Sequence, residues 1–213
     1  AGLSWKDDLP EHFQVLWKTA LKEIIEMEEV SFKRSFKPEG VQGRPTLVCY
    51  HDGSKKGIGC AVYIRWKLAK PRVVYVKRET GQVEMLEEYH VQLVVAKAKI
   101  AKSNKVPRNE MDGLIMLVRL VTAILPGLVM KPVSILIVGD SMCTIQSVEA
   151  ESKILKDFFN NRCEEFGEHV RQWESDGIEV EPLYYTPSEA NVSDLATKGE
   201  ATKQDVDENS EWQ

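Results

Sequence analysis

Four acidic side chains stand at positions where carboxylates from separate segments of the chain could meet. Asp52 and Asp140 each close an apolar run that is typical of a β-strand, and each is followed by small turn residues. Glu110 lies in the first turn of an expected helix, and Asp194 lies in a short expected helix after the last strand. In an open α/β sheet, ligands gather where strands end, so side chains at such positions can converge.

Taken together, the four residues form an ordered set of Asp, Glu, Asp and Asp. If they converge, two carboxylates about 4 Å apart repel by roughly 4 kcal/mol at an effective dielectric near 20. Such a cluster is stable only when it is protonated or neutralised by cations. Ligands that are all oxygen, with no His or Cys, favour Mg²⁺ or Mn²⁺ over zinc. Two such ions, about 3.5–4 Å apart, clamp the attacking and leaving oxygens of an in-line phosphoryl displacement.

Each acid also has a purely structural interpretation, and the sequence leaves both open. Asp52 and Asp140 could be turn residues that cap the segment that follows. Glu110 stands where the helix dipole favours an acid. Asp194 could be an ordinary surface residue. The ordered combination, and no single residue, favours a metal site.

The elements that must position these acids follow from hydrophobic periodicity. The expected order is β-β-β-α-β-α-β, an α/β fold with a mixed central sheet, in which a three-strand antiparallel meander joins parallel strands and helices flank the sheet. The expected strands are 46–52, 59–66, 133–140 and 178–185, and the β-like runs 73–77 and 90–101 could extend the same sheet. The expected helices are 107–125 and 152–174. The stretch RETGQVEMLEE (78–88) is hard to place and is interpreted as an excursion from the sheet.

The chain is expected to have three parts. Residues 1–40 form a connector with an amphipathic helix, in which Phe13, Trp17 and Ile24 belong to an i, i+3, i+4 pattern. Residues 41–199 form the main domain, and SFKPEGVQGRP (35–45) is predicted to be a linker. Residues 200–213 form an acidic tail whose polar composition favours disorder.

Composition leaves a nucleic-acid partner open. The formal net charge is −5, but residues 199–213 carry −4 of it, so the preceding chain is close to neutral. The four cysteines form no CxxC pair, which makes a zinc site improbable and favours reduced thiols in the cytoplasm or nucleus. The sequence contains no apolar run of 18 residues and begins without the layout of a secretory signal, so we expect neither a membrane span nor secretion.

Five motifs in the right order resemble one family. They are CYHDGSKKGIGCAVYIR (49–65), VVAKAKIAKSNKVPRNEMDGL (94–114), ILIVGDSMCTI (135–145), FFNNRCEEF (158–166) and TPSEANVSDLATKG (186–199). The chain resembles the ribonuclease H domain of retroelement polyproteins, most closely that of BEL/Pao-type LTR retrotransposons. GLSWKDDLPEHFQVLWKTAL (2–21) is similar to the connector that follows the reverse transcriptase in those polyproteins.

The resemblance implies a ribonuclease H-like fold in which Asp52, Glu110, Asp140 and Asp194 bind two Mg²⁺ ions, with Mn²⁺ able to substitute. The implied substrate is the RNA strand of an RNA–DNA hybrid. One metal would activate a water and the other would stabilise the leaving 3′-oxygen, which leaves a 5′-phosphate. The implied partner is the reverse transcriptase domain of the same polyprotein, in a cytoplasmic virus-like particle or the nucleus.

Three features depart from the family pattern. The family more often has Ala at the position of Gly53, and the stretch 67–90 is longer than usual. Cellular relatives carry a histidine in the loop before the last aspartate, whereas the loop here, TPSEANVS, has none. His51 and His90 are interpreted as ordinary histidines near strands.

Basic residues accumulate just before Glu110. No acid occurs from Tyr89 to Asn109, and the alternation of Lys97 and Lys99 places both on one strand face. The face is either simply solvated or a patch that tracks phosphates, which would make binding salt-sensitive. Candidate substrate contacts are Gly53, Ser54, Lys97, Lys99, Arg108, Asn109 and Ser141.

Two other functions remain open at this point. An integrase or transposase relative would share fold and metals, but its carboxylate order ends in a distant glutamate, whereas here the glutamate is second. A degenerate domain could keep the fold as a nucleic-acid-binding or scaffolding module. The oligomeric state is not predicted.

Overall fold

The computed structural model describes residues 8–27, 35–78, 81–150 and 157–198. Contacts divide the chain into two compact units, one of which is Ser35–Glu200. The described part of the other unit contains α1 (Glu11–Met27), so the predicted N-terminal helix is confirmed.

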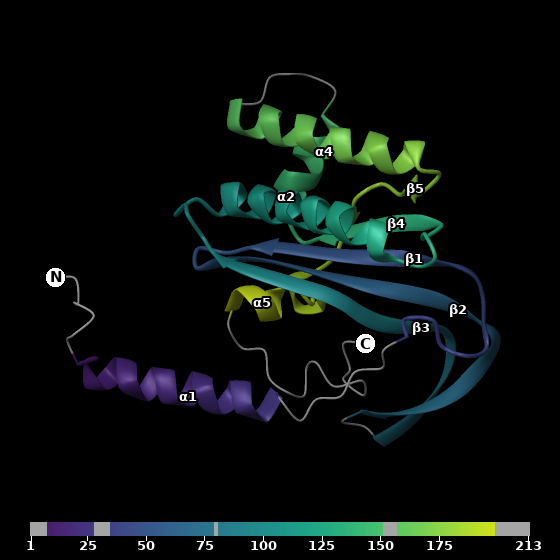
Figure 1. Cartoon of the computed structure of the whole chain (residues 1–213), viewed down its shortest axis with the longest axis horizontal. Coiled ribbons are helices and arrows are strands. Elements are labelled where there is room, and N and C mark those ends of the chain that lie inside the picture. Colours follow the sequence, from purple (N-terminus) through teal and green to yellow (C-terminus); the bar gives the residue numbers. More distant parts are fainter. Residues whose placement is uncertain (1–7, 28–34, 79–80, 151–156, 199–213) are drawn as a thin grey trace. The chain divides into compact units, whose positions relative to one another are not determined.

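A six-stranded mixed sheet forms the centre of the Ser35–Glu200 unit (Figure 1). Its strands are β1 (Val41–Gly53), β2 (Gly57–Arg78), β3 (Gly81–Ile100), β4 (Ser134–Gly139), β5 (Glu179–Val180) and β6 (Tyr184–Tyr185). The order is β3-β2-β1-β4-β5, and β6 also pairs with β4. β1, β2 and β3 are antiparallel, β4 is parallel to β1, and β5 and β6 are parallel to β4. The predicted fold class, a meander joined to parallel strands, is confirmed.

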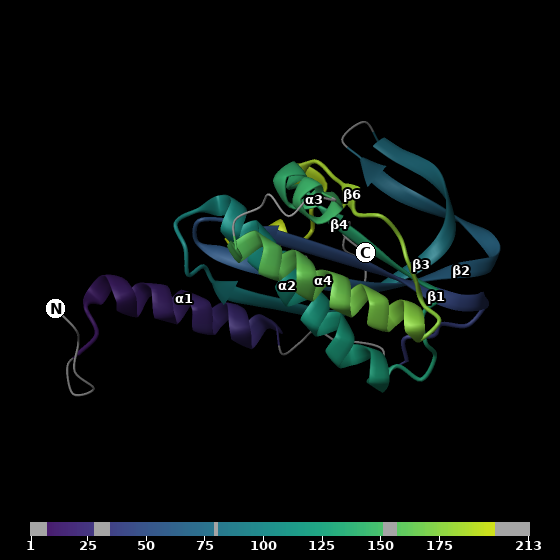
Figure 2. The ribbon, with the colours of Figure 1, turned by 90° about the horizontal axis from the view of Figure 1, so that it is seen from above.

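Helices cover both sides of this sheet. They are α2 (Val106–Ile124), α3 (Met142–Glu149), α4 (Asp157–Ser175) and α5 (Asp194–Lys198), with short 3₁₀ turns at Leu125–Gly127 and Ser188–Ala190. α2 and α4 lie on one side and α5 on the other (Figure 1), and α4 runs along α2 (Figure 2). The indole N–H of Trp173 on α4 donates to the hydroxyl of Thr122 on α2 at 3.0 Å, which ties the two helices together.

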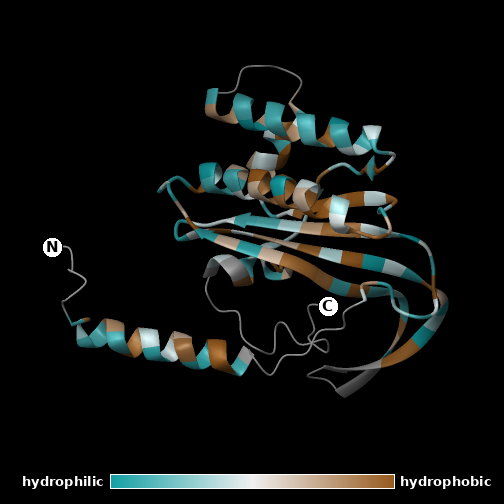
Figure 3. Ribbon diagram, viewed as in Figure 1, coloured by the Kyte–Doolittle hydropathy of each residue, from teal (hydrophilic) through white to brown (hydrophobic). Residues whose placement is uncertain are grey.

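Alternation along the strands divides the apolar side chains between two clusters. On β1, Leu47 and Cys49 join the main core beneath α2, whereas Val48 packs on the other side of the sheet with Tyr63 and Val138. Figure 3 shows apolar residues along the central strands and α2. Because successive side chains of a strand point to opposite faces, one strand supplies both clusters.

Two glycines allow α2 to lie directly against the end of β1. A side-chain carbon at Gly113 would stand 2.6 Å from the carbonyl oxygen of Asp52, and one at Gly53 would stand 2.1 Å from the backbone nitrogen of Glu110. Neither distance leaves room for a Cβ. Gly53, a departure from the family pattern, therefore brings the first turn of α2 and Glu110 to the strand end.

The stretch 67–90 differs from the prediction. Residues 73–77 are not a separate strand but the far half of β2, and β3 already begins at Gly81, within the segment interpreted as an excursion. Beyond Leu68, β2 pairs only with β3, so the two strands continue as a hairpin past the edge of β1. The register shifts between Lys67 and Arg72. This region also contains Pro71, which cannot donate to the ladder.

Two further predictions are corrected. The segment 35–45 is not a linker throughout, because β1 starts at Val41. The last strand divides into β5 and β6, which lie on either side of Pro182. The helix α3 was not predicted. The helix expected at 152–174 is confirmed from Asp157 as α4, and residues 151–156 lie outside the described part of the chain. The helix and strand expected at 107–125 and 133–140 are confirmed as α2 and β4.

None of the helices in the described part of the chain combines the length and apolarity that crossing a bilayer requires.

Candidate metal centre

The parallel pairing of β1 with β4 places two aspartates side by side. His51 on β1 is the register partner of Gly139 on β4. The next residue along each strand is therefore an aspartate, Asp52 on β1 and Asp140 just after β4. Two strand ends that neighbour each other in a sheet thus carry the first two acidic groups.

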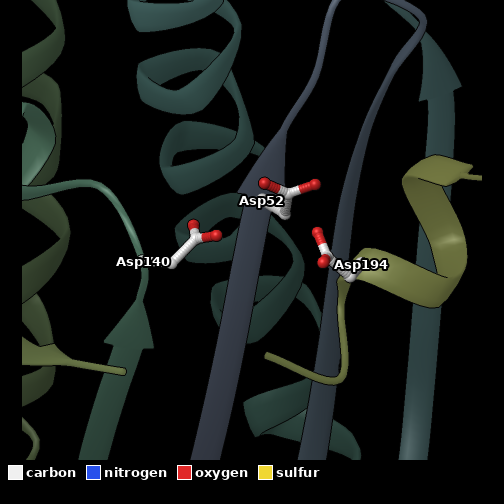
Figure 4. Close-up of side chains that lie close together, drawn as sticks. All are labelled: Asp52, Asp140 and Asp194. Atoms are coloured by element: carbon white, nitrogen blue, oxygen red, sulfur yellow. The ribbon is translucent and has the colours of Figure 1, made fainter. Parts of the chain in front are cut away.

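α5 brings a third carboxylate to the same place. Asp194 is the first residue of α5, and Figure 4 shows its side chain close to those of Asp52 and Asp140. Each of the three offers one oxygen, and these oxygens all lie within 4.8 Å of one another. Asp52 is buried, while Asp140 and Asp194 are half-buried.

Burial and charge act on Asp52 in the same direction. Burial, together with the charges of the neighbouring Asp140 and Asp194, raises the pKa of Asp52 from 3.8 to about 6. Hydrogen bonds from the Thr197 hydroxyl and the Gly53 backbone lower this pKa in part. The cluster thus favours a proton or another cation at Asp52.

The donor set fits a hard divalent cation. The three groups are carboxylates from three separate elements, and their oxygens are close enough to share one ion. Oxygen-only sites suit Mg²⁺ and Mn²⁺, which are commonly held by one or two carboxylates together with waters and substrate phosphates.

Glu110 lies beside this group but outside the three residues whose oxygens converge. Its carboxylate accepts a hydrogen bond from the Ser141 hydroxyl at 2.6 Å. Burial raises the pKa of Glu110, the Ser141 hydrogen bond lowers it, and the charge of Asp140 raises it. The charge of Asp140 therefore acts on Glu110, which lies just after the first turn of α2, and Ser141 donates to one of the oxygens of Glu110.

Two more hydroxyls donate to the carboxylates. Ser188 Oγ donates to Asp140 Oδ2 at 2.7 Å, and Thr197 Oγ1 donates to Asp52 Oδ2. With Ser141 on Glu110, three different carboxylates each accept one side-chain hydroxyl bond. Ser188 and Thr197 were not predicted to take part in the site. The only hint in the sequence was that several Ser and Thr residues lie near Asp194.

Asp140 could have been the N-cap of α3, but the structure shows that it is not. The N-cap of α3 is Ser141, whose side chain accepts from the Thr144 backbone N–H at 3.2 Å. Asp140 therefore does not cap this helix, and its carboxylate is left to face Asp52. Ser141, predicted to contact substrate, is only 6% exposed and bridges the start of α3 to Glu110.

Ser54 and Asn109, also predicted to contact substrate, hold two loops together. The Asn109 amide donates to the carbonyl oxygens of Ser54 at 2.8 Å and Ser103 at 2.7 Å, and Asn109 is only 1% exposed. Ser54 Oγ accepts from the backbone N–H of Gly57 at 3.0 Å. These bonds join the β1–β2 turn to the loop that precedes α2.

Lys97 and Lys99 line a groove whose lining residues include none of the four predicted metal ligands. Lys97 and Lys99 are exposed and, with Asn109 and the paired arginines Arg119 and Arg162, border a groove of about 190 Å³ between β3 and α2. Both lysines lie on the same side of β3, as their alternation predicted.

Arg108 packs on an aromatic ring, and His51 is buried. The Arg108 guanidinium lies 4.7 Å from the centre of the Phe158 ring, a distance at which cation–π attraction operates. His51 is 1% exposed. Burial lowers the pKa of His51 to about 4, against the charge of Asp140, so its ring is neutral at pH 7. His90 lies on β3 opposite Trp66.

Comparisons with known proteins found one matching family and several solved structures of similar fold. The family model described as Pao retrotransposon-like RNaseH-like domain matches residues 1–141, which include Asp52, Glu110 and Asp140. No curated protein sequence matches the chain.

Three solved structures illustrate the fold similarity. The N-terminal RNase H domain of rv2228c from Mycobacterium tuberculosis has a TM-score of 0.47 at 10% identity, covering 73% of this chain and 92% of that one. LC11-RNase H1 in complex with an RNA/DNA hybrid has a TM-score of 0.41 at 10% identity, covering 73% of this chain and 95% of that one. The foamy viral protease-reverse transcriptase in complex with dsDNA has a TM-score of 0.38 at 11% identity, covering 76% of this chain and 94% of that one.

Proposed function

Because the chain belongs to the Pao retrotransposon-like RNaseH-like domain family, we propose that it hydrolyses the RNA strand of RNA–DNA hybrids during reverse transcription of a retroelement. The membership confirms the resemblance drawn from the sequence motifs. The partner that we propose is the reverse transcriptase domain of the same polyprotein.

The convergence of Asp52, Asp140 and Asp194 carries the proposal. Three carboxylates with oxygens within 4.8 Å of one another repel unless cations neutralise them, and metal-dependent phosphoryl transfer uses such a cluster. Two bound Mg²⁺ or Mn²⁺ ions would supply Lewis-acid stabilisation of the attacking and leaving oxygens. The residues that would hold them are Asp52, Asp140 and Asp194, with Glu110 as the fourth ligand.

Nearby serine and lysine side chains support binding of a phosphate backbone. Ser141 orients Glu110, and Ser188 orients Asp140, through the hydrogen bonds described above. Lys97 and Lys99 place positive charge in the groove beside α2. Contacts to phosphates fix the position of a nucleic acid without reading its sequence, and a hybrid would be recognised by groove shape and 2′-hydroxyls.

The test is cleavage of four end-labelled duplexes of one sequence: RNA–DNA hybrid, DNA–DNA, RNA–RNA, and a DNA duplex with a single ribonucleotide. We expect loss of the RNA strand of the hybrid in Mg²⁺ or Mn²⁺ and no product in EDTA. Cleavage or joining of the DNA–DNA duplex would instead indicate an integrase-like enzyme. Binding of the hybrid without cleavage in either metal would indicate a binding module.

The raised pKa of Asp52 predicts that metal stabilises the protein in a pH-dependent manner. A folded-state pKa near 6, above the usual 3.8, means that without metal the contribution of Asp52 to stability is complete below about pH 3.8 and is lost as the pH rises through 6. A cation needs the ionised carboxylate, so it competes with the proton. Thermal unfolding should therefore show a larger Mn²⁺-induced rise in Tm at pH 7.5 than at pH 5.

Asp52→Asn serves as the control for this pH dependence, because an amide does not titrate. The variant should show a small Mn²⁺ effect at both pH values. Equal Mn²⁺-induced shifts of the wild-type Tm at pH 5 and pH 7.5 would contradict the assignment of Asp52 as a metal ligand.

A further inference from the structure

The short helix α5 needs external support to hold Asp194 in place. α5 comprises only the five residues Asp194–Lys198, and isolated helices of this length do not persist in water because nucleation is unfavourable. Asp194 nevertheless has to stand within a few ångströms of Asp52, which belongs to a different element. The support must come from side chains that join the α5 segment to β1.

Asn191 provides the first of these joints. It is 1% exposed, and its amide Nδ2 donates to the main-chain carbonyl oxygen of His51 at 3.0 Å. Its Oδ1 accepts from both the backbone N–H and the hydroxyl of Ser193, at 3.2 and 2.6 Å. Its own carbonyl oxygen accepts from the Asp194 N–H at 3.0 Å. A single buried amide thus connects β1 to the turn that begins α5.

Thr197 provides the second joint, one turn further along the helix. It is 5% exposed, and its hydroxyl donates to Asp52 Oδ2. The carbonyl oxygen of Asp194 lies 3.2 Å from the same hydroxyl and is the other available acceptor. A hydroxyl carries one hydrogen, so Thr197 can hold Asp52 or fold back on its own helix, but cannot do both at full strength.

The backbone of β2 fits against this joint. A side-chain carbon at Gly57 would lie 3.4 Å from the Thr197 carbonyl oxygen and 3.6 Å from its Cα. An alanine at position 57 would therefore just touch the backbone of Thr197, so α5 lies close to the start of β2.

We propose that Asn191 and Thr197, here called the α5 clasp, fasten α5 to β1, and that Thr197 is a positioning residue that orients the Asp52 carboxylate for cation binding. The inference rests on the proposed metal-dependent function. Thr197 donates to Oδ2 of Asp52 and so fixes the rotation of that carboxylate. Asn191 donates to the carbonyl oxygen of His51, the residue before Asp52, and accepts from the backbone N–H of Asp194.

The experiment compares Thr197→Val, which keeps the shape but removes the hydroxyl, with Thr197→Ser, which keeps the hydroxyl. Mn²⁺ binding to the full chain is measured by calorimetry without nucleic acid, so that the readout is independent of cleavage. Removing a group that orients a metal ligand typically weakens metal affinity by about 10–100-fold. We expect Thr197→Val to weaken binding by about tenfold or more and Thr197→Ser to bind within about threefold of wild type.

Thermal unfolding of the metal-free variants separates orientation from loss of fold. Both variants should unfold cooperatively above the temperature of the binding experiment. Wild-type affinity in Thr197→Val would overturn the proposal, and so would equal losses in Val and Ser, which would show that only the methyl packing matters. Failure of the wild-type chain to bind Mn²⁺ would instead overturn the proposed function, and the role of Thr197 with it.

Discussion

Replacing Asp140 by Asn should abolish metal-dependent cleavage of an RNA–DNA hybrid while making the metal-free protein more stable. The substitution removes one of three charges whose oxygens lie within 4.8 Å of one another, so it relieves repulsion in the absence of metal. Groups that merely orient a metal ligand are worth about 10–100-fold in affinity or activity. Loss of a ligand itself should therefore exceed about 100-fold.

The opposite directions of these two effects make the result diagnostic. Initial cleavage rates and the Tm in EDTA are measured on the same preparations. Asp176→Asn is the matched control: its carboxylate is half-exposed and pairs with Lys131 at 3.5 Å, away from the strand ends, and it should change neither value appreciably. An Asp140→Asn variant that cleaves at the wild-type rate would remove Asp140 from the proposed metal site.

The second large effect is expected at Gly113. Alanine is ordinarily better than glycine inside a helix by about 1 kcal/mol, yet here we expect Gly113→Ala to lower the free energy of unfolding by about 1–3 kcal/mol, the usual cost of overpacking. The added carbon would lie 2.6 Å from the carbonyl oxygen of Asp52, which is backbone of a buried strand and cannot easily move aside. α2 must shift instead, and Glu110 shifts with it.

Gly127→Ala is the appropriate comparison for this variant. No atom lies within 4 Å of a side-chain carbon built at Gly127, so this substitution should be close to neutral. Denaturant unfolding of both variants gives the free energies. If Gly113→Ala were stabilising, as helix propensity alone predicts, α2 could not lie as close to β1 as the structure places it.

The parts of the fold that could be predicted are those in which burial determines the residue pattern. ILIVG (135–139) is apolar without interruption because β4 is covered on both faces. The hairpin arm beyond Leu68 could not be assigned in the same way. There β2 has only β3 as a partner, so neither face imposes a clean alternation. Pro182 is visible in the sequence, but it does not explain the division of the last strand, because the N–H groups of Glu179 and Glu181 face β4 and the nitrogen of Pro182 faces away from it.

The candidate site likewise has one part that could be predicted from the sequence and one part that could not. The closeness of Asp52 and Asp140 could be predicted, since it follows from parallel pairing of two strands that end in an acid. The hydrogen bonds of Thr197, Ser188 and Asn191 could not, because they depend on the path of the chain after β6 and on side-chain geometry. Asn109 illustrates the converse: a polar residue next to a site residue was predicted to contact substrate, but the structure uses it to join two loops.

The carboxylates reach the site from the end of β1, the first strand of the meander, from the end of β4 and from α5, segments far apart in the sequence. No stretch of the chain shorter than Asp52–Asp194 contains all three, so an unfolded or truncated chain offers no comparable ligand set. A ligand that binds only the complete fold stabilises it in proportion to the logarithm of its concentration over Kd. Under the proposed function, the concentration of free magnesium would then help to determine how much of the protein is folded as well as how fast it acts.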